Sequence, residues 1–261
     1  MNNQINIVYF SATGTTARIV KEIALGMDEN FIAYNRTLPA QREPHLSFGP
    51  DDIVIIGIPV YSGRIPLFLL EDLKKIKGNG TRAVFVAVYG NRHYDDALLE
   101  LKNEMEINGF QGVAAGAFIG EHSNTVKVAT GRPDAADLKA ARAFGTEVSR
   151  KIHQLLNQSV IPPLSIPGNY PYKERKTAPP MIPITEDFCT SCGLCARHCP
   201  MEAIDVNDYK TIDETKCIHC SSCVKRCPVH AKSIHHEVFE TITQTLIEHL
   251  GTVYHEPEWF L

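Results

Sequence analysis

Residues 189–200 read CTSCGLCARHCP, and residues 217–228 read CIHCSSCVKRCP. Both stretches follow the pattern C-x2-C-x2-C-x3-C-P, and together they contain all eight cysteines of the 261-residue chain. Cysteine thiolates at this spacing are typical ligands of two four-iron clusters. The sequence therefore predicts eight metal ligands, which are Cys189, Cys192, Cys195, Cys199, Cys217, Cys220, Cys223 and Cys227.

Disulfides and zinc are the two alternatives for these cysteines. A disulfide framework is typical of secreted chains, and this N-terminus has no signal peptide. Zinc sites usually group cysteines two by two, and not as three close members with a fourth before proline. Iron–sulfur clusters fit the pattern better than either alternative.

The two stretches belong to an internal repeat with an offset of 28 residues, which carries Cys189 onto Cys217 and Ile184 onto Ile212. Such a duplication predicts two halves related by a pseudo-twofold axis. Residues 183–236 closely resemble the bacterial two-cluster ferredoxins. The resemblance implies a small α+β domain at 184–236 with two [4Fe-4S] clusters. One would be held by Cys189, Cys192, Cys195 and Cys227, and the other by Cys217, Cys220, Cys223 and Cys199.

The first part of the chain, residues 1–157, alternates apolar runs with amphipathic segments. Runs at 5–10, 53–58, 83–88 and 113–118, with a weaker one at 31–34, are typical of buried parallel strands. Helical spacing of apolar residues appears around 19–27, 66–73, 98–105 and 138–152. The predicted fold is α/β, a doubly wound five-stranded parallel sheet.

A hydroxyl-rich loop follows the first predicted strand and precedes a helix. It contains Ser11, Ala12, Thr13, Gly14, Thr15 and Thr16, and no lysine. Backbone N–H groups at a helix N-terminus can bind a phosphate in this position. Helix capping by serine and threonine alone is the simpler alternative. The pattern Ser-x-Thr-Gly-x-Thr resembles the FMN-phosphate loop of flavodoxins, which implies bound FMN.

Two further loops lie at the same carboxyl edge of the predicted sheet. In flavodoxins the corresponding loops enclose the isoalloxazine ring, so the resemblance implies a set of FMN contacts here. They are Pro59, Val60, Tyr61, Ser62, Gly63, Tyr89, Gly90, Asn91, Arg92, Tyr94 and Asp95. Tyr61 and Tyr94 are the aromatic candidates, because the single tryptophan is Trp259 in the tail.

Residues 158–183 are rich in proline and predict an extended, fairly stiff linker between the domains. After the repeat, residues 237–261 predict an amphipathic helix followed by a tail. The whole arrangement resembles the flavodoxin–ferredoxin fusion proteins of anaerobic bacteria and archaea.

The expected function is electron transfer between the two clusters and FMN, with redox proteins as partners, and it needs no catalytic side chain. An FMN-dependent reductase of a quinone, nitro compound or tetrapyrrole is the alternative, and a subunit of a larger redox complex is a third. The net charge of −4 gives no support for nucleic-acid binding. The absence of a membrane-spanning apolar run and the use of cysteine as a metal ligand predict a cytoplasmic protein. The sequence leaves a homodimer open.

Overall fold

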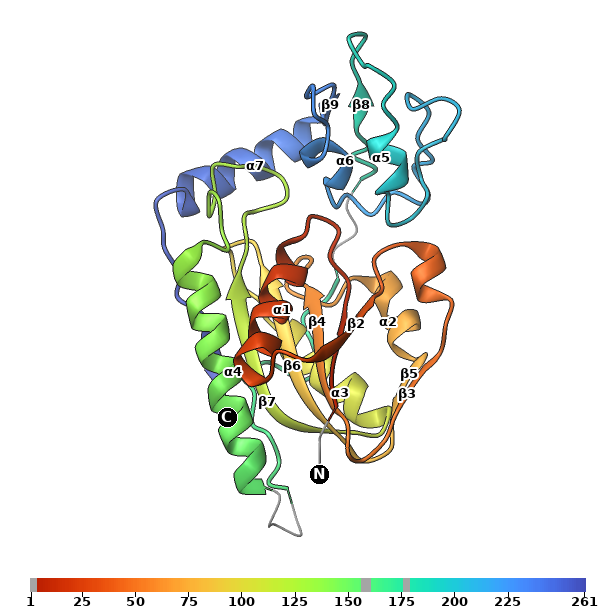
Figure 1. Ribbon diagram of the computed structural model, residues 1–261. Helices are drawn as coiled ribbons and strands as arrows, with labels where there is room; N and C mark the ends of the chain where they lie inside the picture. Colours follow the sequence, from red (N-terminus) through yellow and green to blue (C-terminus); the bar gives the residue numbers. More distant parts are fainter. Residues whose placement is uncertain (1–3, 156–160, 176–178) are drawn as a thin grey trace.

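The computed structural model describes residues 4–155, 161–175 and 179–261 and consists of a large α/β part and a small cysteine-rich part (Figure 1). Within these residues one six-stranded sheet has the order β10-β7-β6-β4-β1-β2. The five parallel strands are β1 (Ile5–Tyr9), β2 (Phe31–Asn35), β4 (Ile53–Pro59), β6 (Thr81–Tyr89) and β7 (Phe110–Ile119). These are the five strands that the apolar runs predict, so the predicted sheet is confirmed.

The order of the parallel strands places the second strand at one edge, next to the first. Counted along the chain, the order is 2-1-3-4-5, which is the flavodoxin-like form of the doubly wound sheet. In such a sheet the chain reverses its direction of winding between the first and third strands, here β1 and β4. Ligands bind outside the carboxyl ends of these strands.

Helices cover both faces of the sheet and form two apolar layers. α1 (Thr15–Met27) and α4 (Ala135–Leu155) pack on one face, and α2 (Leu67–Leu73) and α3 (Ala97–Ile107) pack on the other. A short 3-10 turn, η1 (Pro39–Arg42), and a small parallel pair, β3 (Leu46–Phe48) with β5 (Ile76–Gly78), lie outside the main sheet. The sequence patterns did not predict these short elements.

Two glycines allow α1 and α4 to cross at close range. A Cβ atom on Gly145 would lie 2.0 Å from the carbonyl oxygen of Ile23, and one on Gly26 would lie 2.0 Å from that of Arg142. No side chain fits at such distances, so the two backbones touch directly. The hydroxyl-rich loop at residues 11–16, the candidate phosphate loop, precedes α1, and its position therefore depends on this crossing.

The cysteine-rich part repeats its local structure at the spacing seen in the sequence. α5 (Leu194–Arg197) and α6 (Ser222–Lys225) correspond at an offset of 28 residues. Left-handed backbone also recurs at that offset, at Ser191 and His219 and again at Gly193 and Ser221. β8 (Ile184–Thr185) pairs with β9 (Lys232–Ser233), which joins the beginning of the first half to the end of the second.

The C-terminal segment returns to the large part. α7 (Glu237–Leu250) leads away from the cysteine-rich part, and β10 (Glu258–Phe260) then pairs antiparallel with β7 at the sheet edge (Figure 1). The ring of Trp259 stacks on Phe144 of α4, with centroids 5.7 Å apart. The tail is therefore a sixth strand, which the sequence did not predict.

The described part of the linker, residues 161–175, runs in extended form along α3. Asp96 at the start of α3 accepts bonds from the backbone N–H groups of Asn169 and Lys173, at 2.8 and 2.6 Å. The guanidinium of Arg175 contacts Glu100 at 2.9 Å. The linker is fastened to the α/β part along this length. Residues 158–160 and 176–178 of the predicted linker lie outside the described residues. None of the described helices is long and apolar enough to cross a membrane.

Replacing Gly145 by alanine should destabilise the protein by about 1–3 kcal/mol, because the added methyl group forces α1 and α4 apart. Gly49→Ala is the matched control, since the nearest atom to its added Cβ would be 3.7 Å away. Thermal unfolding followed by circular dichroism measures the difference. Equal melting temperatures for the two variants would contradict the close crossing.

Candidate functional site

The hydroxyl-rich loop leaves the N-terminus of α1 open. Gly14 is the N-cap, with φ of 91°, and as a glycine it offers no side chain to the first N–H groups of the helix. Ser11 is buried, and its hydroxyl accepts the backbone N–H of Ala17 at 3.0 Å. Thr16 is also buried, but its hydroxyl has no hydrogen-bond partner. An unpaired buried hydroxyl at a helix N-terminus suits an anionic ligand, and helix capping alone does not account for it.

A solvent-open cavity of about 480 Å³ lies at the carboxyl edge of the sheet. The predicted FMN contacts that line the cavity are Ala12, Thr13, Thr15, Thr16, Pro59, Val60, Tyr61, Tyr89 and Gly90. The phosphate loop and both predicted ring loops therefore meet at one place, although their residues are far apart in sequence. We call this the flavin cavity.

A fourth wall of the flavin cavity is formed by the loop after β7, residues 120–123, which the sequence analysis missed. His122 packs against Gly90 so closely that a Cβ on Gly90 would lie 2.7 Å from the imidazole Cδ2. Its Nδ1 accepts the backbone N–H of Asn124, so the neutral ring carries its proton on Nε2. Burial lowers the pKa of His122 to about 4, helped by Lys225 and Arg92. The ring is therefore a neutral hydrogen-bond donor at physiological pH.

Eight predicted contacts do not line the flavin cavity, and two of them, Ser11 and Gly14, belong to the hydroxyl-rich loop. The Tyr94 ring is 2% exposed, packs in the core and donates its hydroxyl to Glu258 at 3.0 Å. Asn91 donates its amide to the carbonyl of Val253 at 2.8 Å. Ser62, Gly63, Arg92 and Asp95 also lie outside the lining. The tail thus engages two side chains, Tyr94 and Asn91, that the sequence analysis assigned to the cofactor.

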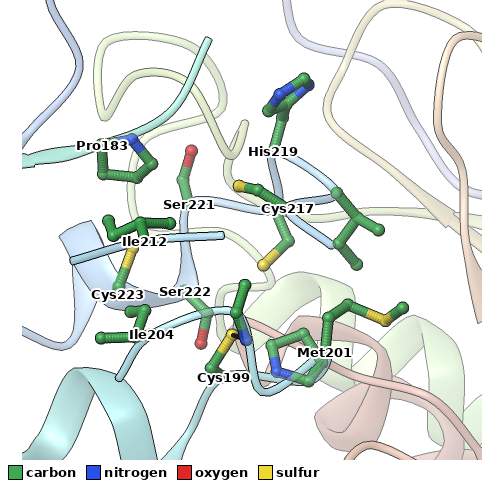
Figure 2. A pocket seen from close by; sticks show the side chains of 14 residues that line it. Pro183, Cys199, Met201, Ile204, Ile212, Cys217, His219, Ser221, Ser222 and Cys223 are labelled. Carbon is green, nitrogen blue, oxygen red and sulfur yellow. Dashed lines mark hydrogen bonds between the residues drawn. The ribbon is translucent and has the colours of Figure 1, made fainter. Parts of the chain in front are cut away.

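Four cysteines from both halves of the repeat line a second, largely apolar cavity of about 390 Å³ (Figure 2). They are Cys199, Cys217, Cys220 and Cys223, which are the four ligands that the ferredoxin resemblance assigns to one cluster. We call this set the inner cluster site. The four cysteines come from both runs of the sequence and meet at this one cavity, which is the crosswise grouping that the ferredoxin resemblance implies.

Burial dominates the acid–base chemistry of the inner cluster site. It raises the pKa of Cys220 and of Cys223 to about 12, and the neighbouring cysteines add to the shift. Without metal these groups are neutral thiols, so iron must displace their protons on binding.

No three of the His, Cys, Asp and Glu side chains in the described residues are placed to hold a single metal ion.

The remaining cysteines, Cys189, Cys192, Cys195 and Cys227, form the outer cluster site. Cys192 is exposed, whereas Cys195 is buried. The backbone N–H of Ala231 donates to Cys227 at 3.1 Å, and that of Ala203 donates to Cys199 at 3.3 Å. These two bonds are equivalent in the repeat. Amide donors of this kind stabilise thiolate ligands and set cluster potentials.

Direct hydrogen bonds join the inner cluster site to the phosphate loop. The hydroxyl of Ser222, next to Cys223, donates to the carbonyl of Ala12 at 2.8 Å, and Arg226 donates to the same oxygen at 3.2 Å. Cys220 lines the flavin cavity as well as the inner cluster cavity. The two candidate cofactor sites therefore share a wall.

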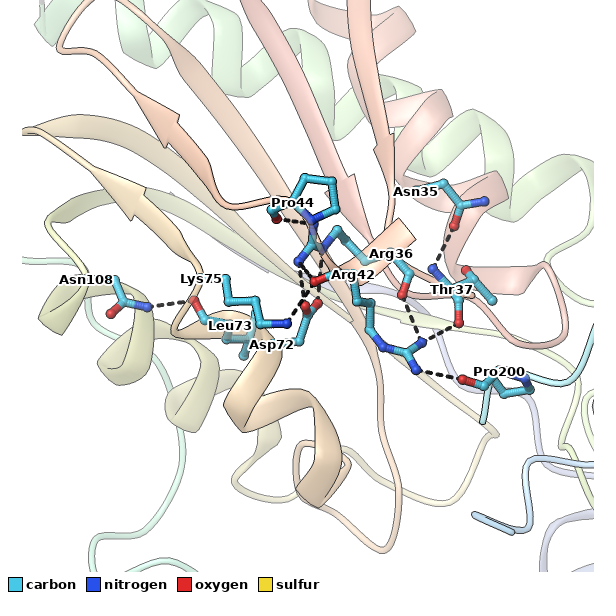
Figure 3. Close-up of polar contacts among 10 residues, drawn as sticks. All are labelled: Asn35, Arg36, Thr37, Arg42, Pro44, Asp72, Leu73, Lys75, Asn108 and Pro200. Atoms are coloured by element: carbon cyan, nitrogen blue, oxygen red, sulfur yellow. Dashed lines mark hydrogen bonds and ion pairs between the residues drawn. The ribbon is translucent and has the colours of Figure 1, made fainter. Parts of the chain in front are cut away.

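A second bridge runs through Arg42 of η1. Its guanidinium donates to the carbonyl of Pro200 at 2.7 Å and to that of Thr37 at 2.5 Å (Figure 3). Nearby, the buried Arg36 pairs with Asp72 at 2.5 Å and fixes the chain before η1. An ion pair of 2.6 Å between Lys225 and Glu121 adds a third contact. These bridges hold the cysteine-rich part in one orientation on the sheet.

The crosswise ligand set can be tested by replacing one cysteine of each run. Cys199→Ser should remove the inner cluster and about half of the iron, although Cys199 belongs to the first run. Cys227→Ser should remove the outer cluster and a similar amount of iron. Iron analysis and electron paramagnetic resonance of the reduced protein measure both. Loss of the same cluster signal in the two variants would contradict the crosswise arrangement.

The comparison with protein families gives one result for this chain. Residues 188–231 match the family described as 4Fe-4S dicluster domain. The match contains all eight cysteines and both helices of the repeat. Among curated proteins nothing matches.

Several solved structures are similar to the α/β part. A flavodoxin from the domain Archaea is 15% identical over 57% of this chain and 99% of its own, with a TM-score of 0.41. Flavodoxin 2 from Bacillus cereus is 15% identical over 57% of this chain and 99% of its own, with a TM-score of 0.42. Rubredoxin oxygen:oxidoreductase from Desulfovibrio gigas is 15% identical over 60% of this chain and 37% of its own, with a TM-score of 0.43.

The assignment of the α/β part rests on its strand order and on the position of its phosphate loop. The assignment of the C-terminal part rests on the repeated cysteine motif and the family match. The chain is a fusion of a domain with the flavodoxin-like fold and a ferredoxin domain that carries two 4Fe-4S clusters.

Proposed function

We propose that this protein passes single electrons between its two [4Fe-4S] clusters and an FMN bound in the flavin cavity, and so links a low-potential donor to an acceptor. The observation that carries the proposal is the position of Cys220. This residue, a predicted ligand of the inner cluster, lines both the inner cluster cavity and the flavin cavity. A cluster bound on one side of Cys220 and a flavin bound on the other would therefore be close to each other.

The two cluster sites differ in their access to solvent, and this difference sets the order of transfer. The outer site has the exposed Cys192, and Phe188 beside Cys189 is 62% exposed. The inner site is in contact with the α/β domain, because Cys220 belongs to the apolar core of that domain. A partner protein therefore reaches the outer cluster, and electrons pass from there through the inner cluster to the flavin.

The chain's residues fit FMN in three respects. The open N-terminus of α1 and the unpaired hydroxyl of Thr16 suit its phosphate. Tyr61 provides an aromatic wall, and burial, together with Cys220 and Cys217, raises its pKa well above the ordinary value, so that it stays neutral. His122 offers its Nε2–H. When bound, FMN supplies chemistry that accepts or donates one or two electrons.

A carrier role fits these sites without any catalytic side chain. Placing all redox groups in one chain fixes their distances and removes the need for collision between separate carriers. Redox proteins are the expected partners of the outer cluster, and clusters with thiolate ligands favour partners with a positive docking surface. A reductase of a small acceptor is the second candidate, because a large cleft lies beside the inner cluster site.

Replacing Thr13 and Thr16 together by valine should weaken FMN binding by about 10- to 100-fold, because hydrogen bonds to a charged phosphate are lost. Fluorescence titration of the flavin-free protein with FMN measures the affinity. Iron content is the internal control and should not change. An unchanged FMN affinity would place the cofactor elsewhere or remove it from the proposal.

Reduction of the flavin through the clusters should be a first-order process whose rate does not depend on protein concentration. In the test, holoprotein is mixed anaerobically with a substoichiometric one-electron reductant, and flavin absorbance is followed by stopped flow. The Cys199→Ser variant should lose this phase and keep its FMN. A rate proportional to protein concentration would favour transfer between molecules instead.

A further inference from the structure

A second cleft lies between α2 and the ferredoxin domain, outside the flavin cavity. It holds about 1500 Å³ of space open to solvent and has a mainly apolar lining. Leu67 and Phe68 of α2 form one wall, and Met201 and Ile218 form the facing wall. We call it the interdomain cleft. Its size exceeds that of the flavin cavity, and none of the predicted cofactors needs it.

Both redox sites border the interdomain cleft. Cys217, a ligand of the inner cluster site, is part of its lining. Tyr61 lines the cleft on one side and the flavin cavity on the other. A molecule in the cleft would therefore contact the inner cluster's own ligand and would be separated from the flavin by one aromatic ring.

Three cationic side chains line the cleft, and they are Arg64 on the α/β side, Arg175 in the linker and Lys216 on the ferredoxin side. Arg64 and Arg175 both line it, and both pair with the single carboxylate of Glu100, at 2.6 and 2.9 Å. The Glu100 side chain is 2% exposed, and its single negative charge is shared between two guanidinium groups. The two arginines and Glu100 together carry one net positive charge. Glu71, which is itself part of the lining, pairs with Lys74 at 2.6 Å.

Part of the apolar wall of the cleft is exposed to solvent. Leu67 is 66% exposed although the neighbouring Leu69 is buried. Phe68 packs edge-on against Phe10, with centroids 5.1 Å apart, so its ring is held in place. An exposed apolar surface beside a fixed positive charge suits a ligand that is apolar at one end and anionic at the other.

We propose that the interdomain cleft binds an organic anion with a planar apolar body. The anionic group contacts Arg175 and Arg64, and the body lies against Leu67 and Phe68. A role of this ligand as redox acceptor or donor rests on the proposed electron-transfer function. The binding of the ligand is tested independently of that function.

Two redox-inert probes of the same shape test the site, 2-naphthoate and its neutral analogue 2-naphthamide. Isothermal titration of the oxidised holoprotein should give about 10-fold tighter binding for the carboxylate, which is the effect of one charge-assisted hydrogen bond. Arg175→Gln should remove this 10-fold preference and leave naphthamide binding unchanged. Arg142→Gln, at an exposed arginine that pairs with Glu22 far from the cleft, should change neither affinity.

The apolar wall is tested with a second pair of variants. Leu67→Ser should weaken both probes by about 3- to 10-fold, because the contact area for the ring is lost. Ile107→Ser, which removes an 80% exposed side chain from α3, should have no effect. Equal binding of the two probes, no binding of either, or equal effects of Leu67→Ser and Ile107→Ser would overturn the proposal.

Failure of this inference can be told apart from failure of the proposed function. If the probes do not bind but flavin reduction stays first order, only the cleft ligand is refuted and electron transfer within the chain stands. If the probes bind as expected but flavin reduction depends on protein concentration, the cleft stands and the transfer route is refuted.

Discussion

The carbonyl oxygen of Ala12 is the point on which the relation between the two domains depends. It lies in the phosphate loop and accepts hydrogen bonds from Ser222 and Arg226 of the ferredoxin domain. The Ser222 bond is buried, so losing it would leave a polar group unpaired at a cost of about 1–3 kcal/mol. Because Ser222 stands between two cluster ligands, the same contact brings Cys220 to the flavin cavity.

A second constraint is the buried carboxylate of Glu100. It accepts from Arg64, Arg175 and the backbone N–H of Ile65. A buried carboxylate needs such partners, because an unpaired charge in the interior is strongly destabilising. The three contacts bind the linker to α3 and to the loop after β4. The linker therefore helps to shape the interdomain cleft and the approach to the inner cluster.

Long apolar runs made the central sheet predictable. Strands buried on both faces leave an almost continuous hydrophobic signal, which β1, β4, β6 and β7 all show. Short strands carry no such signal, because two or three residues pair only where tertiary packing brings a partner. β8, β9 and β10 are of this kind. The loop at 120–123 was within reach of prediction, since β7 ends at the same edge of the sheet as the strands before it.

The sequence alone predicted the eight cysteines as cluster ligands and identified the hydroxyl-rich loop, because the residues of each motif are close neighbours along the chain and their spacing dictates their local geometry. The tertiary structure decided which loops meet. Tyr94 and Tyr61 are both tyrosines in loops at the carboxyl edge of the sheet. In the structure the Tyr94 hydroxyl donates to Glu258 of the tail, whereas Tyr61 lines the flavin cavity. Cys220 reaches that cavity through contacts between residues more than 200 positions apart. Such contacts arise from the packing of whole elements, and no local pattern encodes them.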